Sequence, residues 1–138
     1  MSDDSEQIPG DTRLYRRLHP TQIVYDDNEG VVRASSGAFR DKRLSVNLGN
    51  ELDRIGESPA FALRNYPQHS LGWFSVEFAR DEEGQEIEST PTPDDPTHGE
   101  VVGNKSGARR DRFAKKTELC ILRQEFLRPD VRNRLPKD

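Results

Sequence analysis

Apolar and polar side chains alternate most clearly in residues 69–80. If this segment is extended, Phe74, Val76 and Phe78 lie on one face, because successive side chains of a strand point to opposite sides. The segment also holds the only tryptophan of the chain, Trp73, which adds to the apolar weight that a core requires. We therefore predict a central β-strand here, with the core forming against it.

Shorter β-rich segments occur on both sides of this strand. Residues 22–25 and 31–33 flank a run of turn-forming residues, which predicts a hairpin. Two short helices are predicted, one over residues 50–56 and a basic one from about residue 106 to 118, each preceded by a residue that can cap its N-terminus. Further short strands are predicted at residues 14–18, 44–48, 101–103 and 119–126.

Together these segments predict an α+β fold with a mostly antiparallel sheet of five to seven short strands and two short helices. The length of 138 residues suits a single domain, which we place at residues 13–128. Residues 1–12 and 129–138 are polar and are expected to be flexible tails. Residues 81–100 carry eight carboxylates, three prolines and no Lys or Arg, which predicts a solvated loop.

The composition places much of the chain at the surface, because hydrophobic residues make up 31%, charged residues 33% and the mean hydropathy is -0.95. No apolar run approaches the roughly 18 residues that cross a bilayer, and the acidic N-terminus lacks the features of a signal peptide. We therefore expect a cytoplasmic protein that binds no membrane. The single cysteine, Cys120, excludes an internal disulfide, and its apolar neighbours indicate a buried, unreactive thiol.

The charges are distributed unevenly along the chain. Residues 103–138 contain eleven Lys or Arg and five Asp or Glu, whereas residues 1–102 contain ten and twenty. Such a division allows the acidic part to fold against the basic part, or the basic part to meet an acidic partner such as nucleic acid. We favour the internal arrangement, because Asp111, Glu118 and Glu125 interrupt the basic residues.

The start of the basic third is similar to a phosphate-binding loop. Residues 103–107 are rich in glycine and lead into the predicted helix, where free amide groups could hold an anion. The full Walker spacing is missing, and charged runs are most often solvated faces. The residues that an anion or a nucleic-acid backbone would contact are Lys105, Ser106, Arg109, Arg110, Arg112, Lys115 and Lys116.

Metal-binding side chains are present but have no metal-site spacing. No two histidines are three or four residues apart, as they would be to share one face of a helix. We therefore predict ordinary hydrogen bonds for these residues, and neither a metal nor a cofactor. The candidate ligands are His19, His98, Asp94 and Asp95.

Two sets of residues are similar to known families. Residues 14–20, 35–41, 44–46 and 95–105 resemble a group of small prokaryotic proteins, a likeness that implies no particular activity. The second resemblance is to ADP-ribosyltransferase-like enzymes, which use an Arg, a Ser-Ser segment and a Gln/Glu-x-Glu triplet. It implies NAD as the substrate, although the aromatic-rich nicotinamide pocket of that family is missing here.

On the second resemblance, Arg16 would hold the dinucleotide phosphate, Ser35 would order the ribose pocket and Glu88 would support the ribosyl cation. This enzyme hypothesis requires the three side chains to converge in one cleft. The nucleic-acid hypothesis requires the basic groups of residues 105–134 to line one face. We favour a third hypothesis, a non-enzymatic binding or accessory protein that docks on a macromolecular partner, most simply another protein.

Overall fold

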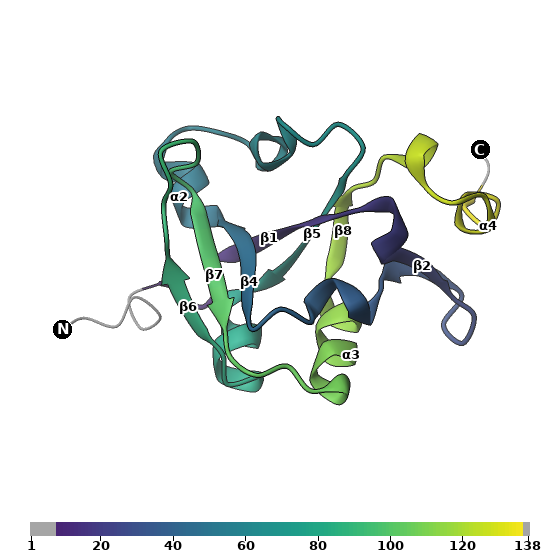
Figure 1. The fold of residues 1–138 in the computed structure, drawn as a ribbon, viewed down its shortest axis with the longest axis horizontal. Helices are drawn as coiled ribbons and strands as arrows, with labels where there is room; N and C mark the ends of the chain where they lie inside the picture. The colour runs from purple at the N-terminus through teal and green to yellow at the C-terminus, as the bar shows by residue number, and fades with distance from the viewer. Residues whose placement is uncertain (1–7, 137–138) are drawn as a thin grey trace.

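The computed structural model describes residues 8–136 and has the α+β fold that the sequence predicts. The main sheet of the described residues has six strands, within the predicted five to seven, and two further strands lie outside it. Six strands form one sheet in the order β6-β7-β4-β1-β5-β8, and every neighbouring pair in it is antiparallel. The remaining two strands form a hairpin (Figure 1). The strands are β1 (Arg13–Leu18), β2 (Ile23–Asp26), β3 (Val31–Ala34), β4 (Arg43–Leu48), β5 (Ser70–Ser75), β6 (Glu86–Ser89), β7 (His98–Val102) and β8 (Glu118–Ile121).

Short helices and helical turns connect the strands. The α-helices in residues 8–136 are α2 (Gly49–Arg54), α3 (Gly107–Lys116) and α4 (Pro129–Arg132). None of the helices in these residues is long and apolar enough to span a bilayer. The helical turns are η1 (Pro20–Gln22), η2 (Ser36–Phe39), η3 (Pro59–Leu63), η4 (Phe78–Glu82) and η5 (Gln124–Phe126).

The sheet is covered on both sides, so each face has its own apolar cluster. We call the first the α3 face: here side chains such as Leu14 and Phe74 pack against α3, η2 and the β2–β3 hairpin. Phe113 of α3 lies 5.1 Å from the ring of Phe74 and 5.7 Å from that of Phe39. The opposite side is the α2 face, where Tyr15 and neighbouring side chains pack against α2 and η3.

The predicted central strand is extended, but it is shorter than expected and lies beside an edge strand. β5 ends at Ser75, which pairs with the first residue of β1, Arg13, so no strand partner continues beyond this point. The backbone then turns into a helical segment, which begins with a hydrogen bond from Phe78 N to Ser75 Oγ (3.0 Å). Phe78 is buried nonetheless. The centre of the sheet belongs to β4 and β1.

The structure corrects the expectation of a solvated loop at residues 81–100. This segment contains β6 and the first residues of β7, which pair with Glu88 opposite Glu100. The guanidinium of Arg43 offsets the repulsion between the two carboxylates, because it lies 2.9 Å from an oxygen of each. Ile87, between the acidic residues, is fully buried on the α3 face.

The structure also corrects the expected tails wherever it describes them. Ile8 is 6% exposed and Val131 of α4 is fully buried, so both segments contribute to the core. α4 and the hairpin lie at the same end of the molecule, away from β6 (Figure 1). The rest of the expected tails, residues 1–7 and 137–138, falls outside the described residues.

Candidate functional site

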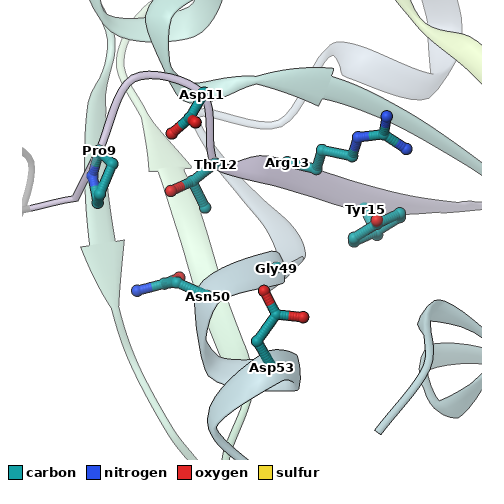
Figure 2. Close-up of a pocket in the computed structure, with 8 residues that line it drawn as sticks. All are labelled: Pro9, Asp11, Thr12, Arg13, Tyr15, Gly49, Asn50 and Asp53. Carbon is teal, nitrogen blue, oxygen red and sulfur yellow. The ribbon is translucent and has the colours of Figure 1, made fainter.

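A pocket of about 480 Å³ lies where the chain enters β1 and where α2 follows β4. We call it the polar pocket, because most of its side chains carry hydrogen-bonding groups (Figure 2). Pockets that combine concave shape with converging polar groups are the usual binding sites of proteins. The lining residues are Pro9, Asp11, Thr12, Arg13, Tyr15, Gly49, Asn50 and Asp53.

Backbone contacts fix the two segments that form the polar pocket. Thr12 N donates to Pro9 O (3.0 Å), and Thr12 O accepts from Val76 N (2.9 Å), which holds the entry to β1 against the end of β5. On the other side, a Cβ added to Gly49 would lie 2.7 Å from Arg13 O. The absence of a side chain at Gly49 therefore allows α2 to begin directly against β1.

α2 contributes polar side chains to the pocket. Asn50 and Asp53 are three residues apart and therefore lie on neighbouring positions of the helix surface. Figure 2 shows the Asp53 carboxylate pointing from α2 toward β1. Neither this carboxylate nor that of Asp11 forms a salt bridge or side-chain hydrogen bond with another residue of the described chain. The polar pocket thus presents two carboxylates without an internal partner.

Arg13 is the only cation among the residues that line the polar pocket, and it stacks on one aromatic ring. Its guanidinium carbon lies 4.0 Å from the centroid of the Trp73 ring, in a cation–π contact. Burial raises the pKa of Tyr15, and the neighbouring Arg13 guanidinium opposes that shift only in part. Tyr15 therefore remains a neutral hydroxyl that both donates and accepts hydrogen bonds.

A second, smaller pocket of about 270 Å³ adjoins the polar pocket, because Arg13 and Tyr15 line both. We call it the apolar pocket, since its other walls are mainly aliphatic. It extends from the start of η3 to the edge strand β8. Its remaining lining residues are Ser58, Pro59, Ala60, Cys120 and Ile121.

The predicted anion-binding residues occupy a different part of the molecule, and Lys105 is turned inward. Lys105 is 5% exposed. Its ammonium group donates to the carbonyl oxygens of Lys42 (3.1 Å), Val101 (3.0 Å) and Gly103 (3.1 Å). Burial lowers the pKa of Lys105 to about 8. These contacts tie the β7–α3 connection to the sheet and leave the ammonium group away from an external anion.

Most of the basic residues on α3 also have internal partners. Arg109 and Arg112 both pair with Glu83, at 3.1 and 2.8 Å. The Glu83 side chain is 3% exposed, and its hydrogen bonds with Arg112 and then Arg109 lower its pKa. Arg110 donates to Lys105 O (2.9 Å), while Ser106 caps α3 by accepting from Arg109 N (3.2 Å).

Lys115 and Lys116 are the two remaining members of the predicted set, and both are exposed. Lys116 lies 5.7 Å above the Phe78 ring. Elsewhere, Arg134 pairs with Asp27 at 2.6 Å. The basic third of the chain therefore meets the acidic part at Glu83 and Asp27, which is the internal arrangement that the charge pattern favoured.

The three residues of the enzyme hypothesis do not converge. Arg16 points to the α3 face, where its guanidinium donates to Ala38 O (3.2 Å) and Ser45 O (3.1 Å). Glu88 lies on β6, separated from β1 by β7 and β4, and its contact with Arg43 places it on the α2 face. Ser35 precedes η2 and makes no side-chain cap there. This geometry gives no support to an NAD-using enzyme.

The histidines and the cysteine have local contacts. His19 caps η1 by accepting from Thr21 N (3.2 Å), and His98 Nδ1 lies 2.9 Å from Thr90 Oγ1. In the described part of the chain, no group of three or more His, Cys, Asp or Glu side chains is placed to hold a metal ion. Cys120 was expected to be buried, but it is exposed on β8, at the sheet edge.

The other candidate metal ligands lie in the loop between β6 and β7. Asp95 Oδ2 accepts from Asn47 Nδ2 (2.8 Å), and its second oxygen accepts from Thr97 N (2.9 Å). Arg64 donates to the backbone oxygen of Asp94 (2.6 Å). These contacts anchor the loop to β4 and η3.

Comparisons with protein-family models, with curated proteins and with solved structures found no match for this chain. The pockets themselves therefore provide the observations from which a function can be inferred. The pockets are not evident from the sequence, which predicts a flexible tail at Asp11 and a helix cap at Asn50. The alternation within residues 13–18 could have indicated two of the lining residues, because Leu14 and Leu18 face one side of the strand and Arg13 and Tyr15 face the other.

Proposed function

We propose that this protein is a non-enzymatic binding protein that docks on a protein partner through the polar pocket and the adjoining apolar pocket. One observation carries the proposal: the carboxyl groups of Asp11 and Asp53 line a pocket but form no salt bridge or side-chain hydrogen bond with a described residue. The basic residues near α3 contrast with them, since most are engaged in internal contacts.

Recognition is the role that the chemistry of the two pockets supports best. The polar pocket contains neither His nor Cys, and the thiol of the apolar pocket, Cys120, donates to Leu71 O at 3.4 Å rather than facing a general base. Desolvation raises the pKa of this thiol, which disfavours the reactive thiolate. Mixed hydrogen-bonding groups beside an aliphatic hollow are typical of binding sites.

The test is affinity capture from a nuclease-treated lysate at moderate salt, with Asp11→Asn/Asp53→Asn compared against the wild type. We expect the wild type to retain a protein that the double variant loses, because the substitutions remove both unpaired charges. Glu86→Gln is the matched control, since Glu86 is an exposed carboxylate of β6 that forms no salt bridge with a described residue.

Two outcomes would contradict the proposal. The first is capture that the double variant and the control retain equally. The second is capture that occurs only in a parallel lysate without nuclease and that Lys115→Ala/Lys116→Ala weakens, which would instead support the nucleic-acid alternative through the two exposed lysines.

A further inference from the structure

The polar and apolar pockets adjoin and form one surface on the α2 face, because Arg13 and Tyr15 line both. We infer that this surface binds a peptide segment that places a Lys or Arg side chain in the polar pocket and an aliphatic side chain in the apolar pocket. The inference builds on the proposed function and specifies the chemistry of the partner.

The charges of the polar pocket favour a cation. Its eight lining residues include two carboxylates and one guanidinium, and that guanidinium is stacked on Trp73. An incoming ammonium or guanidinium can form a charge-assisted hydrogen bond with Asp11 or Asp53, neither of which has to break a salt bridge with any of residues 8–136 first. An incoming anion would face both carboxylates with Arg13 as its only cation among the lining residues.

The neutral polar groups support the same preference. The hydroxyl of Tyr15 and the side-chain oxygen of Asn50 can accept the additional N–H groups of a guanidinium, which has five donors and no acceptor. A ligand that lacked donors would leave these groups and the carboxylates unsatisfied once water is displaced.

The apolar pocket supplies the second part of the recognition. Pro59, Ala60 and Ile121 offer aliphatic contact area, and the volume of about 270 Å³ leaves room for an aliphatic side chain, whose burial is favourable. Because Tyr15 lines both pockets, a peptide lying across its ring can reach the two pockets with side chains that are close in sequence.

The test uses capped pentapeptides of sequence glycine–X–glycine–leucine–glycine, in which X is arginine, lysine, citrulline or glutamate. Binding at millimolar concentrations is followed by NMR shifts of the backbone amides of Arg13, Gly49, Asp53 and Ile121. We expect the arginine and lysine peptides to bind about tenfold more tightly than the citrulline peptide, since one charge-assisted hydrogen bond is lost. Asp53→Asn should weaken the arginine peptide by a similar factor, and Glu86→Gln should leave it unchanged.

Protection of Cys120 provides an independent measurement of the apolar pocket. The thiol lines that pocket, so the arginine–leucine peptide should slow its alkylation by iodoacetamide, and a peptide with glycine in place of leucine should slow it less. The inference is overturned if the citrulline or glutamate peptide binds as tightly as the arginine peptide, if no peptide binds, or if the shifts fall outside these two pockets. A partner captured through Asp11 and Asp53 would then still support the proposed docking function with a different ligand chemistry.

Discussion

Two regions of this molecule combine carboxylates with arginine in opposite ways. Beside α3, Glu83 is almost completely buried between Arg109 and Arg112. At the polar pocket, Asp11 and Asp53 have no such partner in the described residues, and Arg13 stacks on an aromatic ring instead. The first arrangement stabilises the fold, whereas the second leaves charge available for a ligand. Residue type alone does not distinguish the two roles.

The two arrangements differ because different structural elements position the charged side chains. Glu83 follows η4 at the end of β5, and the pair Arg109 and Arg112 lies three residues apart on one side of α3, so a helix and a turn bring the charges together. The pocket carboxylates come from two segments, the entry to β1 and the helix α2. No basic residue of a neighbouring element forms a salt bridge with either carboxylate among residues 8–136.

The largest effect is expected from Glu83→Ala, which should lower the free energy of unfolding by about 3 kcal/mol, because it removes the buried carboxylate that accepts hydrogen bonds from both guanidinium groups. Urea unfolding measures this value. Glu82→Ala serves as the control, since Glu82 is an exposed neighbour without a salt bridge in the described chain, and should change stability by less than about 0.5 kcal/mol. Equal effects of both substitutions would contradict a structural role for Glu83.

Lowering the pH should remove the stabilisation that the Glu83 carboxylate gives to the fold. The pKa of Glu83 lies below its ordinary value of 4.5 in the folded protein, so its carboxylate stabilises the fold above about that pH, and the contribution is lost as the pH falls through the lowered folded-state pKa. In urea unfolding from neutral pH downward, we expect the stability gap between wild type and Glu83→Gln to shrink below pH 4.5. A gap that stays constant to pH 2.5 would mean that the ion pairs contribute little.

Gly49→Ala tests the close approach of α2 to β1 that shapes the polar pocket. The new methyl group would lie 2.7 Å from Arg13 O, so we expect a loss of about 2 kcal/mol together with weaker partner binding. Gly107→Ala is the matched control, because Gly107 also begins a helix and its added Cβ would meet nothing within 4 Å. Equal thermal stability and equal partner capture for the two variants would contradict a role of Gly49 in shaping the polar pocket.

The smallest effect on stability is expected at the pocket carboxylates themselves. Asp11→Asn and Asp53→Asn should each change the free energy of unfolding by less than about 0.5 kcal/mol, because both residues are exposed and make no internal salt bridge with a described residue. Chemical denaturation measures this directly. A destabilisation comparable to that of Glu83→Ala would show that these charges serve the fold after all.

The sequence predicted the fold class because its strongest signals are local. The alternation around Phe74 and within residues 44–48 identified two strands of the sheet, and Ser106 identified the start of α3. β6 was not predicted, because Ile87 is its only large apolar residue and the stabilising Arg43 is 45 positions away from Glu88. Strand order likewise depends on long-range pairing that periodicity does not encode.

The candidate site was harder to predict than the fold. The polar pocket joins residues 9–15 to residues 49–53, and its position depends on the packing of Gly49 against the backbone of Arg13. Lys105 was a candidate contact for an anion, yet its partners are three backbone carbonyls, which have no signature in the sequence. Exposure decides which charges are free, and exposure is a tertiary property.

The contact between Arg13 and Trp73 has a practical consequence. Trp73 is the only tryptophan in the chain, and its indole ring carries a guanidinium at 4.0 Å that belongs to the wall shared by both pockets. Fluorescence excited selectively at tryptophan therefore comes from one indole ring, whose guanidinium neighbour lies at the site. A molecule that displaces the Arg13 side chain should therefore change the tryptophan emission, so that ligands can be screened with unlabelled protein.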